Sequence, residues 1–119
     1  AEWQALLPAG NQIRTVLSDG SVPTCAVSRY VVGTRLPLGL VVTASHNPGI
    51  YNGLKIKEAY GGSATQETVT SVERRIGRSR VTRVPFDEAV KAGTIQSRPM
   101  MPLFLKGIRA FIDLPAIRR

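Results

Sequence analysis

The feature that most constrains the fold is a nearly unbroken apolar run, Leu38–Ala44 (LGLVVTA). Such a run is typical of a strand buried on both faces, which is the usual state of a strand in a parallel sheet. The polar segment that follows it contains Pro48 and Gly49 and therefore predicts a loop. Gly53–Lys57 (GLKIK) then alternates apolar residues on one face with lysines on the other, which predicts a half-exposed strand.

A further strand and two helices are predicted around this pair. The β-rich stretch Ile13–Leu17 ends at a Ser-Asp-Gly turn and predicts a strand. Apolar residues at helical spacing predict a helix over about residues 23–33, which Gly33 ends. The capping-box pattern Ser63-x-x-Gln66 predicts the start of a second helix. This order predicts an α/β fold: a mixed, mostly parallel sheet with helices on both faces, and a C-terminal helical appendage.

The residue pattern in the last part of the chain predicts short helices joined by connecting segments. Residues 86–92 have the pattern of a short helical turn, and Arg98–Pro102 that of a linker. A helix is predicted over residues 103–112, and Asp113 is expected to cap a last turn. The helix has an apolar stripe that we expect to dock on the flank of the domain or on a part that is missing: Leu105, Ile108, Phe111 and Ile112.

Composition excludes several classes of protein. The 43% hydrophobic and 20% charged residues exclude wholesale disorder. The single Cys25 excludes an intramolecular disulfide, and nothing pairs with it at zinc-ligand spacing. No apolar run approaches the roughly 20 residues of a membrane helix, and no basic-then-apolar leader opens the chain, so we expect a cytoplasmic protein without a membrane partner. Both ends look cut, because the chain starts at Ala1 and stops inside an amphipathic pattern.

The net charge of +8 is concentrated in the second half of the chain, and five arginines fall within ten positions. Clustered cations can bind the phosphates of a nucleic acid or another polyanion. A solvated helix end followed by a basic loop has the same pattern, and few aromatic residues lie nearby to stack on bases. Nucleic acid is therefore an unlikely partner, and a basic polyanion-binding module is kept as the alternative function. The cluster comprises Arg74, Arg75, Arg78, Arg80 and Arg83.

The residues that suit chemistry follow the apolar run. The segment Thr43–Pro48 reads TASHNP, and Ser45 comes directly after the predicted strand. Ligand sites in open α/β sheets lie beyond the carboxyl ends of the strands, so we expect the Ser45 hydroxyl to be presented at that edge. Lys55 returns on the next strand, which must start close by. A hydroxyl and an ammonium together suit phosphate chemistry, because one carries the group and the other supplies charge or a proton.

Other readings of this loop fit less well. The spacing of Gly49, Gly53 and Lys55 does not match a P-loop, and the residues around Ser45 lack the glycines of a serine-hydrolase elbow. Neighbouring side chains diverge, so Ser45 and His46 are not expected to pair as nucleophile and base. Taken by its composition alone, the loop could also be an ordinary turn, since Ser, Asn, Pro and Gly are turn residues.

The loop nevertheless resembles the active-site loop of the α-D-phosphohexomutases, the phosphoglucomutases and phosphomannomutases. The resemblance rests on Thr-Ala-Ser-His-Asn-Pro, three residues, then Asn-Gly-Leu-Lys, ending at Lys55. It extends to Val22–Thr24, which looks like the family's helix start, and to Tyr60–Ala64 downstream. Leu103–Arg119 resembles the helix that opens the family's second domain. The resemblance implies a division into residues 1–82 as a partial first domain, 83–102 as a linker, and 103–119 as the start of the second domain.

The resemblance also implies a role for each residue of the loop. Ser45 would be the phosphoserine that donates its phosphoryl group to a hexose phosphate and recovers one from the other end of a bisphosphorylated sugar. Lys55 would act in proton transfer or charge stabilisation. His46 and Asn47 would shape the loop and touch the substrate. A Mg²⁺ would bind the oxygen of the Ser45 phosphate.

The departures from the family pattern limit what the piece could do alone. The family's aspartate-rich metal loop is missing, so the remaining Mg²⁺ ligands would come from outside this chain. The loops that recognise the sugar belong to later domains, which would be the partners of this one. The resemblance therefore implies a mutase as the full-length parent and an inactive isolated chain. The Tyr51–Gly53 form and Tyr60–Ala64 favour glucose over mannose as the sugar.

Overall fold

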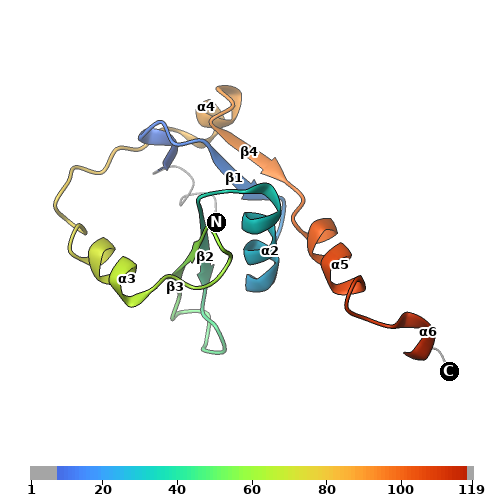
Figure 1. Ribbon diagram of the computed structural model, residues 1–119. Helices are drawn as coiled ribbons and strands as arrows, with labels where there is room; N and C mark the ends of the chain where they lie inside the picture. The colour runs from blue at the N-terminus through green and yellow to red at the C-terminus, as the bar shows by residue number, and fades with distance from the viewer. Residues whose placement is uncertain (1–7, 118–119) are drawn as a thin grey trace. The chain divides into compact units, whose positions relative to one another are not determined.

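The computed structural model describes residues 8–117, which form two compact units. The first unit comprises the residues up to Gly20 and Gln66–Pro99, and the second comprises Ser21–Thr65 and the residues from Met100 onward. Both units contain helices as well as strands (Figure 1), which confirms the α/β class. No helix within residues 8–117 has both the length and the apolar composition needed to cross a membrane.

The first unit is built on a parallel strand pair. Strands β1 (Thr15–Ser18) and β4 (Ile95–Arg98) run side by side (Figure 1), with Thr15 opposite Ile95. Helix α4 (Phe86–Lys91) leads into β4 through Gly93, whose φ of 72° lets the chain turn at the helix end. The core of this unit consists of Ala9, Ala89 and Ile95, with Leu17, Val84 and Phe86 packed against them.

The segment 83–102, for which the sequence predicts a linker, contains helix α4 and strand β4. Helix α4 was expected, but β4 was not. The strand has only four residues, and Ile95 is its only large apolar side chain, which is too little for a recognisable alternation. Tertiary packing fixes it instead, because Ile95 is only 2% exposed in the core of the first unit.

Helix α3 (Gln66–Glu73) also belongs to the first unit. It begins at Gln66 rather than directly after Ser63, because the Ser63 hydroxyl accepts a hydrogen bond from Lys57 Nζ (3.2 Å). Turns continue the chain from the helix to Gly77, whose φ is 76°. Two large apolar side chains of this segment remain exposed, since Val72 is 40% and Ile76 is 73% exposed.

The second unit combines a β-hairpin with three helices (Figure 1). Strands β2 (Leu38–Thr43) and β3 (Gly53–Glu58) are antiparallel, with Leu38 opposite Glu58 and Thr43 opposite Gly53. Helix α2 (Thr24–Thr34) covers one face of the hairpin and buries Ala26 and Val31 almost completely. The fold thus contains one parallel and one antiparallel pair among the described strands.

Strand β2 is buried less than its apolar run predicts. Only Val41 is buried along it, and Leu40 on the opposite face is 42% exposed. The reason is that α2 covers only one face of the hairpin. An apolar run of this kind suits a strand that is buried on both faces. The described residues of this unit leave Leu38 and Leu40 of the other face exposed.

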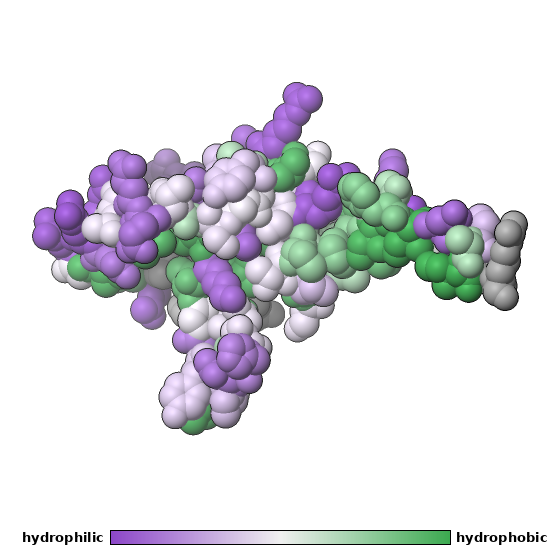
Figure 2. Space-filling view, turned by 60° about the horizontal axis from the view of Figure 1, so that its bottom comes forward, coloured by the Kyte–Doolittle hydropathy of each residue, from purple (hydrophilic) through white to green (hydrophobic). Residues whose placement is uncertain are grey.

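Helix α5 (Met101–Arg109) packs against α2 on the flank of the unit, but three of the four residues of the predicted apolar stripe remain exposed. Leu103 of α5 lies so close to Gly33 of α2 that a Cβ there would come within 2.7 Å of its Cδ2. Asp113 caps the last helix, α6 (Leu114–Ile117), because its Oδ1 accepts the N–H of Ala116 at 3.1 Å. Figure 2 shows hydrophobic side chains gathered over α5 and α6. Those that remain exposed there are Leu105, Phe111, Ile112 and Ile117.

Candidate functional site

The candidate site is the loop between β2 and β3, residues 44–52. It projects from the surface (Figure 2), and Ser45–Asn52 are all exposed. Two turns shape it. The N–H of Asn47 donates to the Ala44 carbonyl at 3.0 Å, and the N–H of Tyr51 donates to the Pro48 carbonyl at 3.0 Å. Because turn residues close both bends, the loop holds a defined path although water surrounds it.

Ser45 stands two residues beyond the end of β2, at the edge the sequence predicts. Its φ is 58°, in the left-handed region that non-glycine residues rarely adopt. Its N–H donates to the Thr43 hydroxyl at 2.9 Å. The residue is exposed.

His46 lies against Ser45, contrary to the expectation that the two neighbouring side chains diverge. The Ser45 Oγ is 3.3 Å from His46 Nδ1, a long hydrogen bond whose direction depends on the tautomer of the imidazole. The left-handed turn at Ser45 is the physical difference, because the expectation of divergence assumes an extended or helical backbone. The imidazole can therefore orient the hydroxyl or exchange a proton with it.

Lys55 lies on β3, opposite Val41 and on the same face of the hairpin as Thr43 and Gly53. It is exposed, and no hydrogen bond or ion pair engages its ammonium within the part of the chain that the structure describes. Lys55 lies two positions along β3 from Gly53, where the strand meets the loop, which is about 7 Å along the strand. The structure thus brings His46 to Ser45 in direct contact, while Lys55 stands further down the strand with no direct contact to Ser45.

Asn47 and Asn52 have different parts in the loop. The backbone of Asn47 closes the first turn. Asn52 Nδ2 donates to the Gly49 carbonyl at 2.7 Å and braces the second turn. Sequence reasoning assigned no part to Asn52 or Thr43 in holding the loop, although both belong to the quoted motif. Their side-chain types were the available signal, because Thr and Asn commonly bond to backbone groups two or three residues away.

Carboxylates are scarce near the loop. No cluster of three or more His, Cys, Asp or Glu side chains occurs within residues 8–117. These residues therefore do not by themselves provide the oxygen cage that Mg²⁺ requires.

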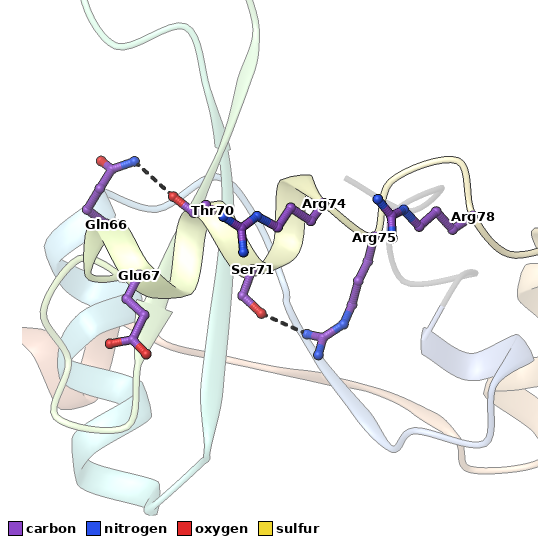
Figure 3. A pocket seen from close by; sticks show the side chains of 7 residues that line it. All are labelled: Gln66, Glu67, Thr70, Ser71, Arg74, Arg75 and Arg78. Atoms are coloured by element: carbon purple, nitrogen blue, oxygen red, sulfur yellow. Dashed lines mark hydrogen bonds between the residues drawn. The ribbon is translucent and has the colours of Figure 1, made fainter.

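A second polar surface lies on α3 (Figure 3). One side of the helix and the turn behind it line a shallow pocket, and the Arg75 guanidinium donates to the Ser71 hydroxyl at 2.9 Å. Gln66 Nε2 donates to Thr70 Oγ1 at 3.3 Å along the same side. The pocket is basic at one end and has a carboxylate at the other; its lining comprises Gln66, Glu67, Thr70, Ser71, Arg74, Arg75 and Arg78.

The loop lies within a segment that matches a known protein family. A family model described as phosphoglucomutase/phosphomannomutase, alpha/beta/alpha domain I, matches residues 3–82. A phosphoglucomutase of Komagataeibacter xylinus is 28% identical over 92% of this chain, which spans 22% of that protein. A phosphoglucosamine mutase of Parafrankia sp. is 33% identical over 79% of this chain, which spans 23% of it.

A solved structure agrees with these relatives. A Thermus thermophilus protein assigned as a phosphomannomutase superimposes on 98% of this chain with a TM-score of 0.83 and 28% identity. The match spans 25% of that protein. The chain thus covers a quarter or less of the length of each of these three proteins.

Proposed function

The chain belongs to the phosphoglucomutase/phosphomannomutase family, and from this premise we propose that Ser45 is the phosphoryl carrier of a phosphohexose mutase. The observation that supports the proposal is the exposed Ser45 hydroxyl, held at the end of β2 inside the segment that the family model matches. The full-length protein would interconvert hexose 1-phosphate and hexose 6-phosphate.

The reaction would proceed as two phosphoryl transfers through Ser45. In the first, the bond between phosphorus and the Ser45 Oγ breaks, a bond forms to a sugar hydroxyl oxygen, and that hydroxyl gives up its proton. The bisphosphorylated sugar then reorients in the site. The bond between its other phosphorus and the sugar oxygen breaks, a bond forms to the Ser45 Oγ, and the sugar oxygen takes up a proton. Such transfers depend mainly on positioning and on stabilisation of the phosphoryl charge.

Three neighbouring residues would support the transfers. Lys55 would stabilise charge or move the sugar proton, since its ammonium is exposed on the face of the hairpin that ends beside the loop. His46 would orient the Ser45 hydroxyl through their 3.3 Å contact. Asn47 would shape the loop and contact the substrate.

Mg²⁺ is the cofactor we propose for the full-length protein. Ser45 would contribute one ligand, an oxygen of its phosphate, and carboxylates from outside the described residues would supply the rest. No step of the reaction is assigned to the ion, because residues 8–117 do not form a metal site by themselves.

The sugar is proposed to be of the glucose type rather than mannose, on the Tyr51–Gly53 and Tyr60–Ala64 patterns. Related proteins carry the names phosphoglucomutase, phosphoglucosamine mutase and phosphoglucomutase/phosphomannomutase. The partners would be the hexose phosphate and the remaining domains of the same polypeptide. A cytoplasmic location and the division at residues 83 and 103 stay predictions from the sequence.

The proposal is tested on the full-length protein by intact mass and by isomerisation. We expect one phosphate on the protein, and its loss in Ser45→Ala together with at least a thousandfold fall in turnover, on the order of the loss of a covalent nucleophile. Glucose, mannose and glucosamine phosphates are compared with and without added Mg²⁺. Ser79→Ala, at an exposed serine of the arginine-rich segment, is the matched control. Wild-type turnover in Ser45→Ala refutes the assignment.

A second candidate function is the binding of a polyanion by α3. The observation that favours it is the gathering of Arg74, Arg75 and Arg78 at one end of a single pocket with two hydroxyls (Figure 3). Binding of this kind depends on charge and weakens steeply with salt. The test is titration with single-stranded DNA and with heparin in 50 and 200 mM salt, about the range over which such contacts are lost. Retained affinity in Arg74→Gln/Arg78→Gln rejects it.

A further inference from the structure

The backbone of Ser45 is held in a conformation that costs free energy. Among residues 8–117 only Gln12, Arg35 and Ser45 have a positive φ without being glycine. Arg35 caps α2, where its N–H bonds to the carbonyls of the last turn and makes this conformation ordinary. Ser45 stands in an exposed loop without such a helix end. Its left-handed conformation belongs instead to the turn that the Asn47 N–H closes on the Ala44 carbonyl at 3.0 Å, in which Ser45 is the first central residue.

Thr43 anchors this turn to the strand. The Ser45 N–H donates to the Thr43 hydroxyl at 2.9 Å, two residues back along the chain. This is the pattern in which a Thr side chain mimics a turn carbonyl. It ties the first residues of the loop to the end of β2.

Thr43 is itself well placed to act as a fixed support. It is the last residue of β2, is paired with Gly53 on β3, and is half buried. Its branched Cβ leaves few side-chain rotamers, so the hydroxyl keeps one direction from the strand. The hairpin, rather than the exposed loop, therefore fixes the position of the Ser45 amide, and this position helps to set the direction of Oγ.

We propose that Thr43 is a positioning residue for phosphoryl transfer: its hydroxyl holds the Ser45 amide in place and so anchors the turn that presents Oγ to the substrate. Thr43 touches neither the substrate nor the reacting atoms. The inference rests on the proposed function, because it assumes that Ser45 carries the phosphoryl group. It adds that position 43 must carry a hydroxyl. This requirement follows from the hydrogen bond to the Ser45 N–H and not from the family match or the composition of the loop.

Two substitutions in the full-length protein separate the hydroxyl from the shape of the side chain. Thr43→Val keeps the branched Cβ and removes the acceptor, whereas Thr43→Ser keeps the acceptor and removes a methyl group. We expect Thr43→Val to lower both kcat and the rate of Ser45 phosphorylation by a bisphosphorylated hexose by about tenfold, the effect of one lost hydrogen bond. KM stays unchanged, because Thr43 does not touch the substrate. Thr43→Ser keeps the wild-type rates.

Hydrogen exchange gives a readout that does not depend on turnover. The Ser45 amide is protected by its bond to Thr43, so it should exchange faster in Thr43→Val and at the wild-type rate in Thr43→Ser. Thr43→Ala repeats the test should valine pack badly at the strand end, with the same expected losses. Thr34→Val is the control, since the Thr34 hydroxyl bonds to the Tyr30 carbonyl at the far end of α2.

The outcomes distinguish this inference from the proposed function. Unchanged phosphorylation and exchange in Thr43→Val, in a protein whose wild type carries phosphate on Ser45, overturn the role of Thr43 alone. Equal losses in Thr43→Ser and Thr43→Val overturn it too, because they assign the effect to packing. A wild-type protein with no phosphate on Ser45 and full turnover in Ser45→Ala overturns both.

Discussion

Two lysines on strand β3 show how differently neighbouring positions are used. Lys55 and Lys57 alternate with apolar residues and lie on the same face of the hairpin. Lys55 is exposed, whereas Lys57 is only 9% exposed, with its stem covered and its Nζ bonded to Ser63. A Cβ added to Gly39, the cross-strand partner of Lys57, would meet Val31 and Val27 of α2, so this face is the one turned toward the helix. The lysine face, not the leucine face, is the packed one.

Lys57 is therefore expected to matter for stability. Lys57→Ala removes three buried methylene groups and should lower the free energy of unfolding by about 2 kcal/mol, whereas Lys57→Met, which keeps an apolar stem, should lower it by less than half of that. Urea denaturation measures both. Equal midpoints for Lys57→Ala and the wild type contradict the packing described for this side chain.

Lys55 should matter for turnover and little for stability, the opposite of Lys57. Lys55→Ala removes an exposed side chain without a partner in the described structure, so the free energy of unfolding in urea should change by less than about 0.5 kcal/mol. Turnover of the full-length protein should fall on the order of a hundredfold, as for a group that moves a proton or stabilises charge. A stable variant with undiminished turnover removes Lys55 from the reaction.

At the scale of elements, close approach between a helix and a strand fixes the second unit. A Cβ at Gly39 of β2 would come within 2.7 Å of Val31 Cγ2, and Val31 is 1% exposed. Helix α2 can rest on the hairpin only because position 39 lacks a side chain. The local sequence gives no hint of this requirement, since glycine at position 39 simply interrupts an apolar run.

Gly39→Ala is therefore expected to destabilise the protein by about 1–3 kcal/mol, the usual cost of overpacking a filled core. Gly49→Ala is the matched control, because nothing lies within 4 Å of the Cβ it would add and its φ is not positive. Thermal unfolding of the two variants should give a clearly lower midpoint for Gly39→Ala alone. Equal midpoints show that α2 can shift to make room.

Element boundaries were predictable where side chains signal them locally. Helix α2 and strands β2 and β3 lie within a residue or two of their predicted bounds, because glycine, proline and apolar spacing act over a few residues. The start of α3 was predicted wrongly, since Ser63 bonds to Lys57 on another element instead of capping the helix. Strand β4 was missed because a contact 80 residues away along the chain defines it.

At the scale of the whole molecule, both units are assembled from segments that are far apart in the chain. The first takes residues from either side of Ser21–Thr65, and β1 pairs with β4 across the whole of that intervening segment. The family match ends at residue 82, before α4 and β4. The first unit therefore continues to Pro99, beyond the last residue of the family match.

The isolated 119-residue chain should have no mutase activity. It spans between 22% and 25% of its compared relatives, and the described residues do not form a metal site by themselves. A coupled isomerisation assay should give the same signal for the chain and for its Ser45→Ala variant, while the full-length protein turns over. Activity of the isolated chain that disappears in Ser45→Ala contradicts this expectation.

The sequence by itself determined the α/β class, the main helices and strands, and the position of Ser45 at the end of β2, because each depends on side chains within a few residues of one another. The tertiary structure decided that β1 pairs with β4, that the lysine face of β3 packs on α2, and that Ser45 turns toward His46. These depend on contacts between segments distant in the chain, or on the backbone turn that the Asn47 N–H closes around Ser45. Local patterns carry no information about which distant partner, or which face, completes the packing.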